Sequence, residues 1–125
     1  MELDYIENVN EFDEHVVRLY NFNQVEAILF RDLILEVINN NLKLNLEKLN
    51  FIKTRNCNLI LGLLDSDEGI FTKDNETFFC ALTKDGYQNI VKLLEPYCTQ
   101  EKKNHQYLYD LDNNINLLFA PEGTW

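Results

Sequence analysis

The sequence has few of the residues that break regular structure, with four glycines and two prolines among its 125 residues. This composition excludes collagen-like chains and proline-rich linkers. Four scattered glycines also cannot build the glycine-rich loop that cradles phosphate groups. No apolar run approaches the ~18 residues that a membrane-spanning helix needs. We therefore expect a folded chain with no membrane segment.

Basic residues are scarce as well. Eleven lysines and arginines stand against 21 aspartates and glutamates, which gives a formal net charge of -10. A charge of this sign opposes binding to nucleic acid backbones and to anionic lipid surfaces. The segment from Met1 to Tyr5 lacks the basic start and apolar stretch of a secretory leader, so we expect a cytoplasmic protein.

Side chains that commonly carry catalysis or bind metals are few. The histidines, His15 and His105, belong to no recognisable motif, and the cysteines, Cys57, Cys80 and Cys98, form no Cys-x-x-Cys pair. No nucleophile elbow and no zinc-protease motif occurs. We therefore expect reduced, buried thiols, no metal, no cofactor and no catalytic residue. A small enzyme with a site assembled from dispersed Asp, Glu and His residues is a less favoured alternative.

The chain has enough apolar material for a core, because hydrophobic residues make up 46% of it and aromatic residues 12%. Its length fits one domain. Residues 1–14 carry six acids and no base, and we interpret them as a loose or capping acidic arm. Residues 15–125 then form a single α+β domain.

Hydrophobic periodicity and turn residues predict the order β-α-β-β-β-α-β-β. The expected fold is a mostly antiparallel sheet of about five or six strands with both helices packed on one face. The expected elements are a strand at 15–21, a helix at 23–38, a doubtful strand within 42–55, strands at 58–64, 70–72 and 77–82, a helix at 83–95, and strands at 107–111 and 115–119.

Local signals mark the ends of both helices. Asn23 and Glu26 form a capping box at the start of the first helix, and the asparagines at 39–41 end it. Thr83 caps the second helix, and Pro96 is expected to stop it.

The continuous apolar run at 58–64 is typical of a central strand that is covered on both faces. The apolar side of the first helix should face the same core. The side chains expected in the core include Leu29, Phe30, Leu33, Leu59, Leu61, Leu63 and Val91.

One segment has the spacing of a calcium loop. Asp65, Asp67 and Glu76 match the ligand spacing of an EF-hand, but Ile70 occupies the position where that loop needs its glycine. We interpret this segment as an acidic hairpin turn without a metal.

The other side of the first helix carries Ile28 and Leu35, with Arg31 and Asp32 between them. Ile28 and Leu35 lie away from the main apolar side of the helix. Either a neighbouring segment covers this ridge, or the ridge contacts a partner or a second copy of the chain. The second case would make the protein a regulatory or adaptor domain.

Acidic residues gather in loops and at the termini, and this is the strongest functional signal in the sequence. We predict that these acids steer a basic protein partner and that nearby aromatic side chains anchor it. The candidate partner-binding residues are Asp65, Asp67, Glu68, Asp110, Asp112, Tyr107, Tyr109 and Trp125.

In size, charge and composition, the chain is similar to the small acidic immunity proteins that bacteria make against their own nuclease toxins. No motif carries this similarity, so it assigns no role to any residue. It implies a non-catalytic inhibitor that neutralises a basic toxin or nuclease by electrostatic capture.

Overall fold

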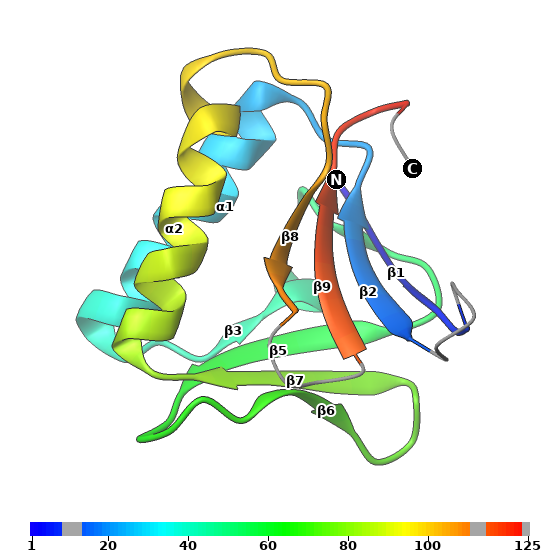
Figure 1. The fold of residues 1–125 in the computed structure, drawn as a ribbon, viewed down its shortest axis with the longest axis vertical. Helices are drawn as coiled ribbons and strands as arrows, with labels where there is room; N and C mark the ends of the chain where they lie inside the picture. Colours follow the sequence, from blue (N-terminus) through cyan, green and yellow to red (C-terminus); the bar gives the residue numbers. More distant parts are fainter. Residues whose placement is uncertain (9–13, 111–114, 124–125) are drawn as a thin grey trace.

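The computed structural model describes residues 1–8, 14–110 and 115–123 (Figure 1). Asp112 and Trp125, two candidate partner-binding residues, lie outside these ranges. The described residues contain both helices and strands, so the expected α+β class is confirmed. The elements are β1 (Glu2–Ile6), β2 (His15–Tyr20), α1 (Gln24–Asn40), β3 (Leu44–Asn45), the short 3-10 helix η1 (Leu46–Lys48), β4 (Lys53–Thr54), β5 (Asn58–Leu63), β6 (Gly69–Thr72), β7 (Thr77–Leu82), α2 (Lys84–Thr99), β8 (Gln106–Tyr109) and β9 (Ile115–Ala120).

The strands form two sheets. The large sheet has the order β4-β1-β2-β9-β8, and the small sheet has the order β3-β5-β7-β6. Both sheets are mixed, because β1 with β4, β2 with β9 and β5 with β7 are parallel pairs. Four of the seven described strand pairs are antiparallel, as expected, but the strands form two mixed sheets in place of the expected single one. In the small sheet, the apolar β5 takes the apolar β7 as its parallel neighbour and leaves the short β6 at the edge.

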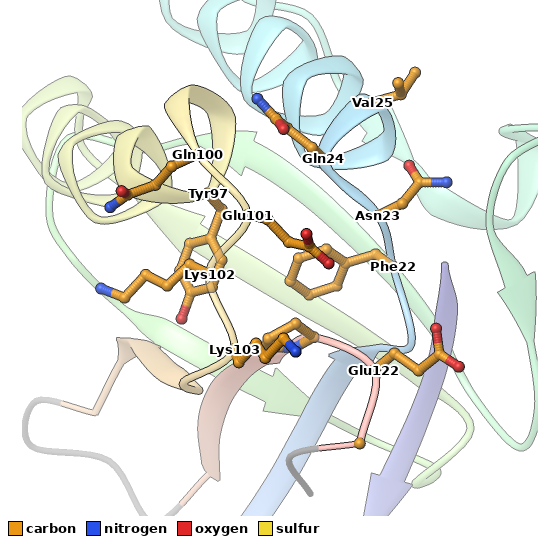
Figure 2. A pocket seen from close by; sticks show the side chains of 12 residues that line it. Phe22, Asn23, Gln24, Val25, Tyr97, Gln100, Glu101, Lys102, Lys103 and Glu122 are labelled. Atoms are coloured by element: carbon orange, nitrogen blue, oxygen red, sulfur yellow. The ribbon is translucent and has the colours of Figure 1, made fainter.

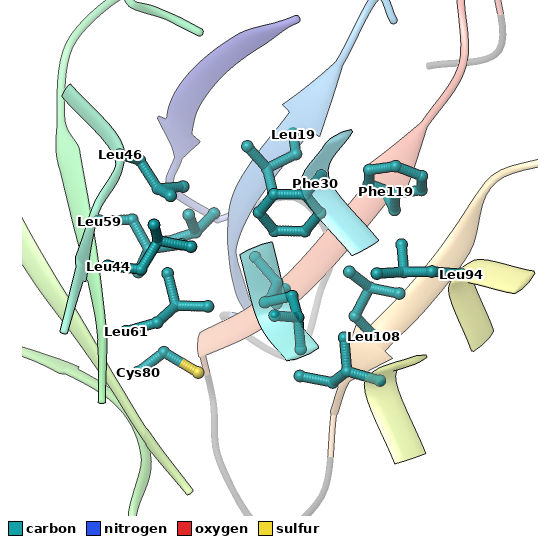
Figure 3. Packing of buried hydrophobic residues seen from close by; sticks show 14 of the residues in the cluster. Leu19, Phe30, Leu44, Leu46, Leu59, Leu61, Cys80, Leu94, Leu108 and Phe119 are labelled. Atoms are coloured by element: carbon teal, nitrogen blue, oxygen red, sulfur yellow. The ribbon is translucent and has the colours of Figure 1, made fainter. Parts of the chain in front are cut away.

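The core fills the space between the sheets and the helices. In Figure 1, α1 and α2 lie side by side on one side of the large sheet, and the strands of the small sheet run across those of the large one. Figure 3 shows Leu59 and Leu61 of β5 grouped with Phe30 of α1 and Phe119 of β9. All four side chains are fully buried, which confirms the central position of β5. Within the described residues, neither helix has the length and hydropathy to cross a membrane.

Part of the acidic arm is a strand. Residues 2–6 form β1, which pairs with β2 on one side and β4 on the other. Leu3 is fully buried, and Asp4 lies opposite Arg18 of β2, with 2.7 Å between the Asp4 Oδ2 and Arg18 Nη2 atoms. The expectation of a loose arm is therefore wrong for these residues, because acids that alternate with apolar side chains fit a strand with one covered face.

The start and end of α1 agree with the sequence signals. The Asn23 side chain accepts a hydrogen bond from the Glu26 N–H at 2.9 Å, and the Glu26 carboxylate accepts one from the Asn23 N–H at 3.2 Å. Asn41 closes the helix in the left-handed conformation, with a φ of 51°. The prediction of Leu29 as a core residue is wrong, because Leu29 is 43% exposed. Ala27, Phe30 and Ile34 define the buried side instead, and this side is turned away from Leu29.

Pro96 does not stop α2, although Thr83 caps the helix as expected by accepting a hydrogen bond from the Gly86 N–H. The helix continues to Thr99, and its last turn buries Tyr97 and Cys98. The Tyr97 ring packs edge-on against Phe119, with 5.1 Å between the ring centroids. This packing offsets the loss of one helical hydrogen bond at the proline.

Three of the residues expected in the core lie at its margin. Leu33, Leu63 and Val91 are half-buried and pack against the core cluster. Each belongs to an element that was expected, but its side chain lies beside the fully buried stripe and not within it.

Candidate functional site

An acidic groove lies between α2 and β8, and α2 supplies one of its walls. Asp85, Asn89 and Leu93 occur at intervals of four residues, which places them in one stripe along the helix. The neighbouring stripe, which includes Tyr87, Ile90 and Leu94, is buried in the core. The burial of that stripe fixes the rotation of α2 and turns the polar stripe toward β8.

The strand β8 supplies the other wall through Tyr107, Leu108 and Tyr109. Among the described strands, β8 lies at the edge of the large sheet and pairs with β9. A β-bulge lies between Tyr107 and Tyr109, which pair with the consecutive residues Leu118 and Leu117. Side chains two apart normally share one face of a sheet, but a bulge breaks this alternation. Accordingly, Tyr107 packs against a small separate cluster that contains Leu118. Tyr109, by contrast, packs against the main core.

The groove encloses a hollow of about 320 Å³. Three carboxylates line it, from Asp67 before β6, Asp85 in α2 and Asp110 after β8. No lysine or arginine is among the described residues that line the hollow. Half-buried Leu93 and buried Leu108 contribute apolar surface. A cationic group in this hollow would therefore meet negative charge as well as a surface for short-range contact.

Asp67 is held in place by the start of α2. Its Oδ1 atom accepts hydrogen bonds from the Thr83 N–H at 2.7 Å and from the Thr83 hydroxyl at 2.9 Å. The absence of a side chain at Gly86 makes room for this carboxylate, because a Cβ atom there would lie 2.8 Å from the same oxygen. The loop that carries Asp67 is thus fixed to the groove.

The phenol of Tyr107 lies among acidic groups. Burial raises the pKa of Tyr107, and the carboxylates of Glu14 and Asp110 raise it further. The His105 ring contacts the Tyr107 ring edge-on, with 6.1 Å between the centroids. Tyr107 therefore stays neutral at physiological pH and keeps its hydroxyl as a hydrogen-bond donor.

The structure brings together four of the residues predicted from the sequence, namely Asp67, Tyr107, Tyr109 and Asp110. Asp65 lies apart and lines a different hollow together with Lys84. Glu68 does not line the groove, and its carboxylate accepts a hydrogen bond from the Ser66 hydroxyl at 2.7 Å.

Sequence reasoning missed the contribution of α2. Asp85 and Asn89 line the groove, and their spacing of four residues could have suggested a shared polar stripe. That spacing does not say which element lies opposite, so the pairing of α2 with β8 was not predictable from it.

The alternative interface on α1 is largely covered. Ile28 and Leu35 are half-buried and pack against the core cluster. Arg31 pairs with Asp32 at 2.8 Å and with Glu95 of α2 at 3.0 Å, so its guanidinium links the two helices. This ridge therefore offers little free apolar surface.

The segment with calcium-loop spacing includes the hairpin between β6 and β7. The Asp74 carboxylate accepts hydrogen bonds from the N–H groups of Thr77 at 3.0 Å and Glu76 at 2.9 Å, and these bonds lower the pKa of Asp74. Such bonds are typical of an Asx turn. Among the described residues, no group of three or more His, Cys, Asp or Glu side chains is arranged to hold a metal ion.

Another hollow, of about 730 Å³, lies where α1 begins and α2 ends (Figure 2). Phe22 and Tyr97 line it together with Lys102, Glu101 and Glu122. Acidic and basic side chains both border this hollow, so its charge favours neither sign. It offers a less selective site than the acidic groove.

The three cysteines are free and buried. Burial raises the pKa of the Cys57 thiol to about 12 and that of Cys80 to about 12. Burial also raises the pKa of Cys98. These groups lack the thiolate character of a nucleophile or metal ligand, and they agree with the expectation of reduced core thiols.

Comparisons with protein-family models, with curated proteins and with solved structures found no match to this chain.

Proposed function

We propose that the protein is a non-catalytic binding domain that captures a basic protein partner at the acidic groove. One observation carries this proposal: Asp67, Asp85 and Asp110 surround one hollow, and no described basic residue lines it. Complementary charge raises the rate of association, and short-range contacts then set the rate of dissociation. Leu93, Leu108 and the tyrosines of β8 would supply the contacts of the second kind.

The specific form that we favour is an immunity-type inhibitor of a basic toxin or nuclease. The size of the chain and its net charge of -10 support this form. The alternative of an adaptor that docks through Ile28 and Leu35 has less support, because both side chains pack against the core.

The first experiment uses an oligolysine peptide as a minimal basic probe and follows the backbone N–H signals of the protein by NMR. We expect the earliest shifts in residues 85–93 and 106–110, which form the walls of the groove. Added salt should weaken these shifts, because screening acts on exposed charges. Shifts that spread over all acidic segments, or that begin elsewhere, would contradict the proposal.

Matched variants make the test independent of total charge. Asp85→Asn with Asp110→Asn changes the groove, whereas Glu36→Gln with Glu47→Gln removes the same charge from exposed positions that do not line it. We expect the first pair to weaken peptide binding severalfold more than the second. Equal effects would show that the groove has no special role.

The same two pairs of variants then test the natural function. The partner to examine first is a basic toxin domain encoded by a neighbouring gene. Stopped-flow measurements should give a slower association for the groove variant and a nearly unchanged rate for the control. Association that depends on neither salt nor the groove acids would refute electrostatic capture.

A further inference from the structure

One carboxylate joins the loop before β6 to the start of α2. The Asp67 Oδ1 atom accepts hydrogen bonds from the Thr83 N–H at 2.7 Å and from the Thr83 hydroxyl at 2.9 Å. The Thr83 hydroxyl oxygen in turn accepts a hydrogen bond from the Gly86 N–H at 3.1 Å. A chain of hydrogen bonds therefore runs from the first turn of α2 through Thr83 to Asp67.

The two oxygens of this carboxylate have different surroundings. Oδ1 accepts two hydrogen bonds, one for each of its lone pairs. No hydrogen bond joins Oδ2 to another residue in the described part of the chain. Asp67 also lines the hollow of the acidic groove. Oδ2 is therefore the oxygen of Asp67 that can still accept a hydrogen bond from a cationic group.

Other contacts fix the backbone around Asp67. The Leu64 N–H and the Glu68 N–H each donate a hydrogen bond to a carbonyl of β7 at 2.9 Å. These two bonds lie on either side of Asp67 in the chain and do not involve Thr83. The loop should therefore keep its path when the Thr83 hydroxyl is removed, and the change should fall on the Asp67 side chain.

Asp67 differs in this respect from the other acids of the groove. Asp85 and Asp110 are exposed, and neither carboxylate accepts a hydrogen bond from a residue within the described ranges. A side chain that rotates freely loses conformational entropy when a partner fixes it, whereas a side chain that is already held loses little. Asp67 can therefore contribute more to binding than its charge alone would.

We propose that Thr83 is a positioning residue of the acidic groove. It holds the Asp67 carboxylate in one orientation and leaves Oδ2 for a cationic side chain of the partner. This inference rests on the function proposed above and gives it a fixed point of contact. Gly86 contributes to the same arrangement, because a Cβ atom there would lie 2.8 Å from Asp67 Oδ1.

The experiment measures the dissociation constant of the oligolysine peptide from the intact protein. Thr83→Val removes the hydroxyl, and we expect the constant to rise about fivefold, the effect of one hydrogen bond. Thr83→Ser keeps the hydroxyl and should bind as the wild type does. Thr72→Val is the matched control. The Thr72 hydroxyl donates to the Thr77 carbonyl at 2.7 Å in the hairpin between β6 and β7, and neither residue lines the groove.

A second comparison separates positioning from stability, because Thr83→Val also removes the cap of α2. In an Asp67→Ala background Thr83 has no carboxylate to hold, so Thr83→Val should no longer change the dissociation constant. Circular dichroism checks that each variant is folded at the temperature of the measurement.

Two results would overturn the positioning role and leave the groove as the binding site. One is an equal rise in the dissociation constant in both backgrounds, and the other is no rise in either. Peptide binding that Asp85→Asn with Asp110→Asn does not weaken would instead overturn the proposed function, and this inference with it.

Discussion

The Asp67 carboxylate accepts hydrogen bonds from both the backbone N–H and the hydroxyl of Thr83, the residue that caps α2. Asp67 therefore serves two purposes, because it lines the acidic groove and also fixes the preceding loop to the start of the helix. Its replacement should affect stability as well as binding. Asp110 and Asp85 are better positions for testing the charge of the groove alone.

Gly86→Ala tests the contact between Asp67 and the helix. A Cβ atom at residue 86 would lie 2.8 Å from Asp67 Oδ1 and 3.0 Å from Leu82 Cβ. We expect a loss of about 1–3 kcal/mol, because the crowding outweighs the higher helix propensity of alanine. Urea unfolding measures the change. In an Asp67→Ala background the loss should fall by about 1 kcal/mol, and purely additive effects would refute the coupling.

Tyr87→Phe tests a hydroxyl that joins α2 to the small sheet. The Tyr87 oxygen accepts a hydrogen bond from the Gly62 N–H at 3.0 Å, and its hydroxyl donates to the Cys80 carbonyl. Its removal leaves buried groups of β5 and β7 without this partner. We expect a loss of about 1–3 kcal/mol in the free energy of unfolding. An unchanged free energy of unfolding would contradict this, because it would mean that the Gly62 N–H and the Cys80 carbonyl find other hydrogen-bond partners when the hydroxyl is absent.

Leu61→Ala tests the central position of β5. Leu61 is fully buried, so its truncation should lower the free energy of unfolding by about 2–5 kcal/mol through lost burial and a residual cavity. Leu64→Ala is the matched control three residues along, at an exposed position, and should change the value by less than about 0.5 kcal/mol. Similar effects at both positions would be incompatible with the assigned faces of the strand.

The cysteines should resist thiol reagents while the protein is folded. Reaction requires the thiolate, and burial raises the pKa of Cys57 and of Cys80 to about 12. Labelling with a chromogenic disulfide at mildly alkaline pH should therefore be slow and should accelerate in urea as the structure opens. Complete labelling within the dead time in native buffer would contradict this prediction.

Asp74→Asn tests the hairpin between β6 and β7 through pH. Hydrogen bonds from Thr77 and Glu76 lower the pKa of Asp74 below its ordinary value of 3.8. A depressed pKa means that the ionised group stabilises the fold above that value, and that this stabilisation is lost as the pH falls through the lower pKa of the folded state. The variant should melt below the wild type at neutral pH, and the difference should narrow in acid. A difference that is constant with pH would show that titration of Asp74 contributes nothing.

Features set by neighbouring residues could be predicted from the sequence. The capping box of Asn23 and Glu26, the left-handed Asn41 and the cap at Thr83 depend on groups a few residues apart. The central position of β5 was also predictable from its apolar run. Such signals act within one element and do not depend on the arrangement of the others. The expectation that both faces of this strand are covered is wrong, because Ile60 is half-buried and its cross-strand neighbour Phe79 is exposed.

Features set by distant residues could not be predicted in this way. The sequence does not show that β2 lies beside β9, or that Tyr97 packs on Phe119 and so keeps α2 helical past Pro96. Some residues of the acidic groove were predictable, but its assembly from distant segments was not. Its tyrosines and two of its acids stand out in the sequence, but Asp85 becomes part of the site through the packing of α2 beside β8.

The parallel pairing of β2 with β9 has a consequence for how the chain folds. His15 pairs with Ile115, so the centre of the large sheet closes a loop that contains most of the protein. The small sheet and α2, by contrast, are built from residues 44–99. Closing a long loop costs conformational entropy before the contacts that it brings together can form. Proteins with many contacts between distant residues therefore fold more slowly. We therefore expect the small sheet to form early. During synthesis, β2 cannot pair with β9 until β9 has left the ribosome.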